Sequence, residues 1–246
     1  MESADMQSRR LTARNLALTT LFAALYAALS FLPLSQVIGF FSRAITAANI
    51  IAPVIGVVLG AYLGSFSTFF GGTIALFFSP YFSPMGLAAG VVTALFAGLL
   101  YSRRRFACAF IYFSLLFIFA FYPLIGPVWL HPPMLWFQLV GFIILVSPIQ
   151  SVALKNLNSK ADEKALFSFF ITFLTATLAG QIAGSLVFEL ISWPVTANLD
   201  VLKGIWQATT FFYPVERTII AFGAALLGLP VHRILFSMGF LKAQES

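Results

Sequence analysis

The side chains that could perform catalysis are few in this chain and form no known catalytic motif. The sequence holds eight Asp and Glu, two His and one Cys among 246 residues. It contains no G-x-S-x-G, H-E-x-x-H, P-loop or G-x-G-x-x-G pattern. His131 and His232 fall on opposite sides of the membrane in the arrangement derived below, and Cys108 has no second thiol to pair with. We therefore expect no enzyme, no metal site and no cofactor.

Polar residues that could bind a ligand occur in the first loop and in the C-terminal quarter of the chain. Ionisable groups at membrane depth are energetically costly, so they indicate function by default. Glu189 and Glu216 could each face Arg217 or Arg43. The simpler interpretation is that both carboxylates lie at the membrane interface and reach water.

Aromatic side chains accompany these polar residues. They form an interfacial belt in many membrane proteins, and they form the apolar wall of many ligand pockets. The sequence leaves both interpretations open. The aromatic residues are Trp193, Trp206, Phe211, Phe212 and Tyr213.

The composition indicates that these residues are positioned by membrane helices. The chain is 60% hydrophobic and 9% charged, with a mean hydropathy of +0.96, whereas a soluble domain carries about 25% charge. Its apolar runs are continuous and long, which favours helices over alternating strands. We expect an all-α integral membrane protein of the polytopic helical-bundle type. Residues 1–246 form a single transmembrane domain, in which residues 1–13 are a cytoplasmic N-terminal segment.

Eight apolar segments are predicted as membrane crossings, although six crossings also fit the charge pattern. Glycines offer places to divide the long run 47–78, and we place the division near Gly64 and Ser65. Pro230 is expected to end the last helix, and residues 193–207 are expected to form a polar and aromatic connection. The segments are 14–32, 47–64, 65–78, 84–101, 106–128, 134–154, 166–191 and 214–229.

Basic residues predict the orientation of the chain. With both termini in the cytoplasm, only Arg43, Lys203 and Arg217 of the 14 Lys and Arg residues face outward. Such a bias is typical of multi-pass proteins. The net charge of +6 is therefore interpreted as orientation in the cell membrane, and no nucleic-acid partner is expected.

The first helix carries a stripe of small residues that could contact another helix. Ala13, Ala17, Thr20, Ala24 and Ala28 recur at three- and four-residue spacing, and Ala23 and Ala27 widen the stripe. Small residues let two helices approach closely. The spacing alone does not decide whether the partner helix is internal or belongs to another subunit.

Three stretches resemble the substrate-binding S component of energy-coupling factor (ECF) transporters, and together they cover about half of the chain. Residues 106–155 depart from the family pattern as a possible extra helical hairpin, since the family usually has six helices. The stretches are 16–33, LALTTLFAALYAALSFLP; 49–80, NIIAPVIGVVLGAYLGSFSTFFGGTIALFFSP, followed by a helix that ends in YSRRR; and 214–235, PVERTIIAFGAALLGLPVHRIL.

The resemblance implies a function in import. An S component captures a vitamin or a related small organic molecule from outside and associates with a transmembrane coupling subunit and two cytosolic ATPases. By resemblance, Ala23 with Ala27, or Ala24 with Ala28, would contact the coupling subunit. The resemblance places substrate in the outer half of the protein, near Gln36, Arg43, Asn49, Trp193, Trp206, Tyr213, Glu216 and Arg217.

Two other functions remain open at this point. A non-catalytic membrane scaffold or assembly protein would bind no small molecule. A lipid-modifying membrane enzyme would use Glu189, Glu216 and His131 as its candidate groups.

Overall fold

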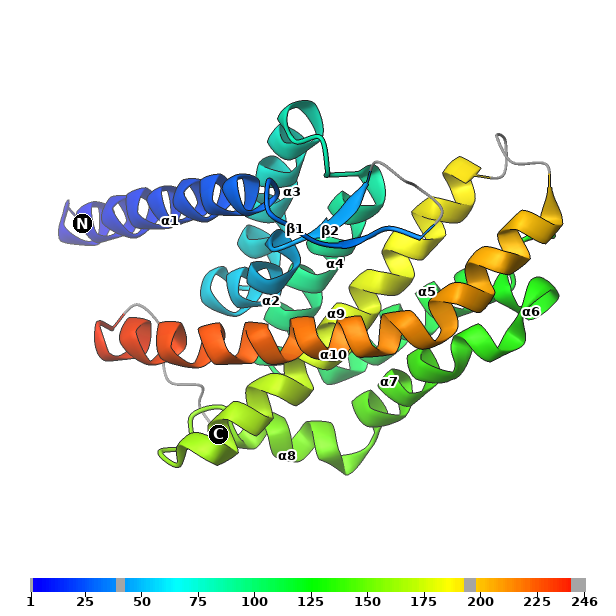
Figure 1. Ribbon diagram of the computed structural model, residues 1–246. Helices are drawn as coiled ribbons and strands as arrows, with labels where there is room; N and C mark the ends of the chain where they lie inside the picture. The colour runs from blue at the N-terminus through cyan, green and yellow to red at the C-terminus, as the bar shows by residue number, and fades with distance from the viewer. Residues whose placement is uncertain (1, 39–42, 193–197, 240–246) are drawn as a thin grey trace.

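The computed structural model describes residues 2–38, 43–192 and 198–239, with side chains from residue 13 onward. These residues form a bundle of helices with one short hairpin of two strands (Figure 1). The elements are α1 (Glu2–Leu29), β1 (Pro33–Gln36), β2 (Ala44–Thr46), α2 (Ala48–Leu59), α3 (Ala61–Phe78), α4 (Pro84–Tyr101), α5 (Arg105–Ala120), α6 (Pro127–Leu130), the 3-10 turn η1 (Pro132–Leu135), α7 (Trp136–Val146), α8 (Pro148–Asn156), α9 (Asp162–Ser192) and α10 (Leu199–Ser237).

Four helices, α3, α4, α9 and α10, are long and apolar enough to cross a membrane. A fifth crossing results if the bent pair Pro132–Val146 and Pro148–Asn156 is taken as one broken span. Three further apolar helices, Ala13–Leu29, α2 and α5, are shorter. The helical class and the membrane character predicted from the sequence agree with these lengths. The total of eight or six crossings stays a prediction, because it depends on the three shorter helices.

The long apolar run between residues 47 and 78 divides at Gly60, so the division predicted near Gly64 and Ser65 is wrong. Gly60 has φ +80° and ψ 173°, a backbone conformation that favours glycine. Gly64 lies inside α3, where an added Cβ would come within 2.9 Å of Gly56 Cα. Gly64 therefore permits α2 and α3 to pack closely, and Gly60 ends one helix and starts the next.

The last helix is much longer than the predicted segment 214–229. α10 begins after Asn198, whose side-chain oxygen accepts hydrogen bonds from the backbone N–H groups of Asp200 and Val201. It continues through Pro214 and Pro230 to Ser237. The predicted connection is therefore wrong for residues 199–207, which are helical, and the predicted stop at Pro230 is also wrong. Proline is tolerated within membrane helices because neighbouring groups can satisfy the carbonyls it frees.

Arg105 on α5 forms hydrogen bonds with backbone and side-chain groups at the break between α7 and α8. The two helices bend by 63° at Ser147 and Pro148. The Arg105 guanidinium donates to the carbonyl oxygens of Leu145 (2.6 Å) and Ser147 (2.8 Å) and also to the hydroxyl of Ser151. Carbonyls exposed by the break are therefore satisfied by a charged donor, which makes strong hydrogen bonds.

Helix α9 is the central helix of the bundle. In its most apolar 18-residue window, 83% of the residues are buried, against 33% for α10. It packs most extensively against α4, and it also contacts α10, α8, α5 and α7. Gly180 and Gly184 lie four residues apart on its α4 side, where an added Cβ at Gly180 would come within 2.4 Å of Ala89 O. The seam between α4 and α9 is thus set by backbone contact at glycine.

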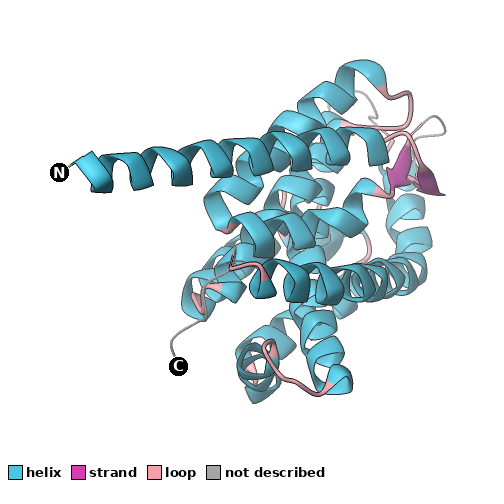
Figure 2. Ribbon diagram, turned by 90° about the vertical axis from the view of Figure 1, so that its left-hand side faces the viewer, coloured by secondary structure: helices cyan, strands magenta, loops and turns pink. Residues whose placement is uncertain are grey.

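The start of α1 and the end of α10 lie on the same side of the molecule, at the left of Figure 1. The strands β1 and β2 lie at the opposite end of α1, and the N-terminal part of α1 projects away from the bundle (Figure 2). This arrangement places the hairpin at the end of the bundle remote from the start of α1.

Candidate functional site

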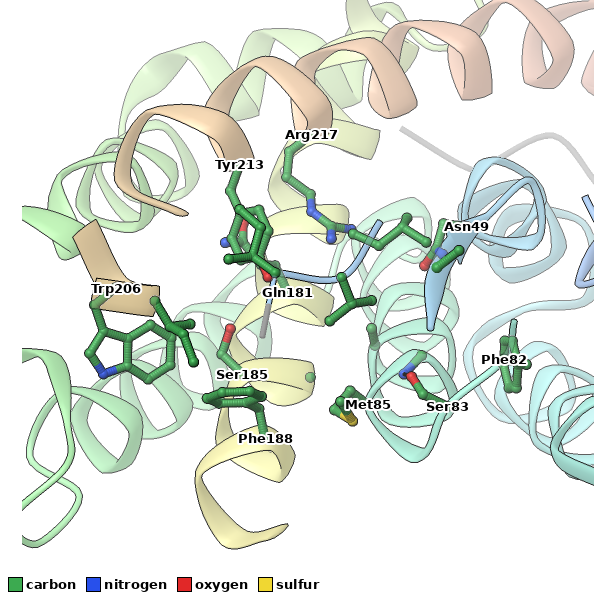
Figure 3. Close-up of a pocket in the computed structure, with 18 residues that line it drawn as sticks. Asn49, Phe82, Ser83, Met85, Gln181, Ser185, Phe188, Trp206, Tyr213 and Arg217 are labelled. Atoms are coloured by element: carbon green, nitrogen blue, oxygen red, sulfur yellow. Dashed lines mark hydrogen bonds between the residues drawn. The ribbon is translucent and has the colours of Figure 1, made fainter. Parts of the chain in front are cut away.

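A pocket lies beneath the β1–β2 hairpin, between α2, α4, α9 and α10 (Figure 3). Its cavity volume is about 50 Å³, and the cavity opens toward the outside of the protein through a mouth. The pocket is lined by Val37, Ile38, Ala44, Ile45, Asn49, Phe82, Ser83, Met85, Gly86, Ala89, Gln181, Gly184, Ser185, Phe188, Ile205, Trp206, Tyr213 and Arg217.

The hairpin covers this pocket and is attached on two sides. On one side, Arg43 Nη1 donates to the carbonyls of Pro80 (3.2 Å) and Phe82 (2.6 Å), and the backbone N–H of Ala44 donates to the carbonyl of Tyr81. On the other side, the Ser35 hydroxyl donates to Glu216 Oε1 on α10 at 2.6 Å. The cover is therefore held by three bonds to the α3–α4 connection and by one side-chain bond to α10.

One end of the pocket has a rigid aromatic wall. The Trp206 indole N–H donates to the carbonyl of Ile125 at 2.9 Å, so its polar edge is satisfied within the protein. Its ring makes edge contacts with Phe119 (centroids 5.6 Å apart) and Phe188 (5.5 Å). Such pairs prefer this T-shaped geometry. Trp206 and Phe188 thus present a fixed apolar surface toward the pocket, at the left of Figure 3.

The middle of the pocket contains polar groups that the protein leaves without partners. Gln181 on α9 is 3% exposed, and neither atom of its amide group has a hydrogen-bond partner among the described residues. Arg217 on α10 is 6% exposed, and its guanidinium carbon lies 5.7 Å from the centre of the Tyr213 ring. Its Nε also lacks a partner in the described part of the chain. Buried polar groups are hydrogen-bonded in most proteins, so each exception requires an explanation.

The structure brings four of the eight predicted substrate residues together at this pocket: Asn49, Trp206, Tyr213 and Arg217. Gln36 and Arg43 lie instead at a separate depression on the hairpin, and Glu216 lines a groove on the other face of α10. Trp193 lies outside the described residues. In this arrangement Arg43 and Glu216 hold the cover of the pocket and do not line it.

Sequence reasoning missed Gln181 and Ser185, the polar residues that α9 contributes to the pocket. Both follow a glycine that faces α4, in the stretch A-G-Q-I-A-G-S. The Gln181 amide within a long apolar run was a signal that could have identified this residue, because a polar group at membrane depth is energetically costly and indicates function. Their direction toward α10 depends on the α4–α9 packing, which no local pattern specifies.

The groups considered for a lipid-modifying enzyme do not line this pocket. Glu189 is fully buried, and neither carboxylate oxygen has a partner in the described part of the chain. Glu216 bonds to Ser35, and His131 lies between α6 and η1. Among the described residues no cluster of three or more His, Cys, Asp or Glu side chains could hold a metal ion.

The alanine stripe of α1 is divided between two environments. Ala23 and Ala27 are buried, and an added Cβ at Gly71 of α3 would lie 2.4 Å from Ala23 O. Ala24 and Ala28 are exposed. The internal alternative is therefore confirmed for Ala23 and Ala27, and contact of Ala24 and Ala28 with another subunit stays a prediction.

Comparison with known protein families, curated proteins and solved structures finds no match to this chain.

Proposed function

We propose that this chain is the membrane-embedded, substrate-binding S component of an ECF-type importer, and that it captures a small organic micronutrient. The observation that carries the proposal is the covered pocket, in which the buried Gln181 amide and Arg217 Nε have no hydrogen-bond partner among the described residues. A protein that binds no ligand would gain stability by replacing such groups with apolar ones. A binding protein keeps them because the ligand supplies the missing partners.

The proposal includes an orientation in the cell membrane. With both termini in the cytoplasm and eight crossings, the hairpin and the pocket face outward, where a nutrient arrives. The charge bias supports this orientation. The short apolar helices α2 and α5 and the broken pair α7–α8 would count among the crossings. Cysteine labelling from either side, with single cysteines placed at Gln36 and at Ser159 in a variant with Cys108 replaced by Ala, tests this part of the proposal.

The proposal also includes partners, a transmembrane coupling subunit and two cytosolic ATPases. The chain has no P-loop, so energy for import would come from the ATPases. Of the two alanine pairs, Ala24 and Ala28 are the pair available to a partner, because Ala23 and Ala27 already pack inside the chain. Close helix approach at small residues would give the contact its affinity.

Co-purification and uptake test the proposal together. The tagged chain is co-expressed with an ECF coupling subunit and its ATPases, and the membrane complex is isolated in mild detergent. We expect the wild-type chain to bring down all three partners, and Ala24→Trp to lose them. Phe110→Trp is the matched control, since Phe110 is 73% exposed on α5. No association of the wild-type chain, together with no small molecule in native mass spectra, would favour the scaffold function instead.

A further inference from the structure

Among the described residues that line the pocket, Arg217 is the only charged side chain, and none of them is a carboxylate that could balance it. Of the described acids, Asp162 pairs with Arg233 and Glu216 bonds to Ser35, whereas the Glu189 carboxylate is buried without a hydrogen-bond partner among the described residues. The other two, Glu163 and Asp200, are exposed and do not line the pocket. A buried charge without a countercharge is strongly unfavourable, so a bound anion would stabilise this site.

The charge of the lining limits the charge of the ligand. Arg217 is the single ionisable cation among the lining residues, and no carboxylate lines the pocket. A ligand with one negative charge would neutralise the site, whereas a doubly charged phosphate would leave one charge uncompensated in a poorly hydrated space. A guanidinium also pairs well with the planar carboxylate, in a two-bond geometry.

Gln181 adds a second requirement. Its buried amide offers one acceptor oxygen and a donor nitrogen, side by side in one plane, and both lack partners among the described residues. A ligand that satisfies both must present a donor next to an acceptor. A cyclic amide edge does so, in the way that a glutamine side chain pairs with the edge of a base.

Aromatic side chains in part of the lining add a third requirement. Tyr213 lies beside the two polar groups, and Trp206 and Phe188 lie toward one end of the pocket (Figure 3). The Trp206 N–H is already bonded to Ile125 O, so its remaining surface offers stacking and apolar contact. A planar ring can make contact with an aromatic face with little loss of conformational entropy.

We propose that the ligand of this pocket is a small planar ring that carries one carboxylate and a cyclic amide edge, with the carboxylate at Arg217 and the edge at Gln181. The inference rests on the proposed function, because it names the substrate class of the same pocket. It is specific to these two residues, and it excludes cationic ligands and neutral ligands as the preferred substrates.

Three commercial probes divide the ligand into its parts. Orotate has the pyrimidine ring, the cyclic amide edge and one carboxylate; uracil lacks the carboxylate; and benzoate lacks the amide edge. Binding of each to the purified full-length protein is measured by isothermal titration calorimetry in mild detergent. We expect orotate to bind at least about tenfold more tightly than either partial probe, since each added charged or polar contact contributes about that factor.

Two variants assign the contacts. Arg217→Met should weaken orotate binding by roughly ten- to a hundredfold and leave uracil binding unchanged. Gln181→Leu should weaken uracil and orotate binding and leave benzoate binding unchanged. Two variants outside the pocket serve as controls. Arg233→Met removes another arginine of α10, and Gln138→Leu removes another buried glutamine, which contacts Met134 Sδ. Both controls should bind all three probes as the wild type does.

Three results would overturn the inferred ligand class. None of the three probes binds, or uracil binds more tightly than orotate, or Arg217→Met leaves orotate binding unchanged. A neutral or cationic compound extracted from the wild-type protein and identified by mass spectrometry would also overturn the class, although the importer function would stand. Failure of the importer function is seen separately, as loss of any association between the wild-type chain and the coupling subunit.

Discussion

Replacing Gly180 with Ala tests whether the seam between α4 and α9 is set by backbone contact. A Cβ at this position would lie 2.0 Å from Thr93 Oγ1 and 2.4 Å from Ala89 O. The threonine hydroxyl can rotate away, but the carbonyl belongs to the backbone of α4. Ordinary contact begins at 3.4 Å, so the two helices must separate by about 1 Å at this level or bend around it, as expected for overpacked sites.

The magnitude follows from two opposing effects. Overpacking in a well-packed core costs about 1–3 kcal/mol, and Gly to Ala within a helix gains up to about 1 kcal/mol. The clash at Gly180 is against backbone, so we expect a net loss of about 1–2 kcal/mol. At Gly184 the nearest atom is Met85 O at 3.0 Å, and the two effects should nearly cancel. At Gly204 no atom lies within 4 Å, so Ala should stabilise α10.

The assay is thermal unfolding of the purified protein in mild detergent, followed by the loss of helical circular dichroism. For a chain of this length about 1 kcal/mol corresponds to roughly 2–4 °C in the midpoint. We expect Gly180→Ala to lower the midpoint by about 2–8 °C, Gly184→Ala to change it little, and Gly204→Ala to raise it. Because Gln181 and Ser185 follow these glycines, Gly180→Ala should also weaken ligand binding. Equal midpoints for Gly180→Ala and Gly204→Ala would refute the proposed backbone contact.

Three further substitutions test other contacts. Ala23→Trp should prevent stable folding, because Ala23 is buried against α3, whereas Ala24→Trp should leave the unfolding midpoint unchanged; fluorescence-detected size exclusion separates the two outcomes. Arg105→Met removes three hydrogen bonds at the α7–α8 break. A hydrogen bond from a charged donor contributes at most about 1.5–3 kcal/mol to stability, so amide hydrogen exchange in α8 should become much faster. Ser35→Ala removes the bond between the hairpin and Glu216, and it should speed ligand dissociation without lowering the unfolding midpoint; unchanged dissociation would show that this bond does not hold the cover.

Hydropathy was sufficient to predict the class and several elements of this fold. The predicted segment 84–101 coincides with α4, because a serine cap and Pro84 mark its start and the polar Ser102 follows its end. The segment 166–191 identifies α9 but omits its first turn. These features are local, since apolar length, caps and prolines act within a few residues of the chain.

The candidate site was only partly predictable. Asn49, Tyr213 and Arg217 were identified as polar or aromatic residues near a membrane interface, and they do line the pocket. Arg43 was selected by the same reasoning, yet its guanidinium bonds to the carbonyls of Pro80 and Phe82. Residue type and approximate depth do not distinguish a residue that lines a pocket from one that holds its cover, because the two differ only in the direction of the side chain.

Hydropathy and charge along the chain are sufficient to predict long apolar helices and an uneven distribution of basic residues. Three other features are seen only in the folded structure. They are the break at Gly60, the division of the α1 alanines into a buried and an exposed pair, and the position of Gln181 and Arg217 in one pocket. The last two depend on the rotation of one helix against another. That rotation is fixed by close packing between segments distant in the chain, such as Gly180 against Ala89, and a hydropathy pattern contains no information about it.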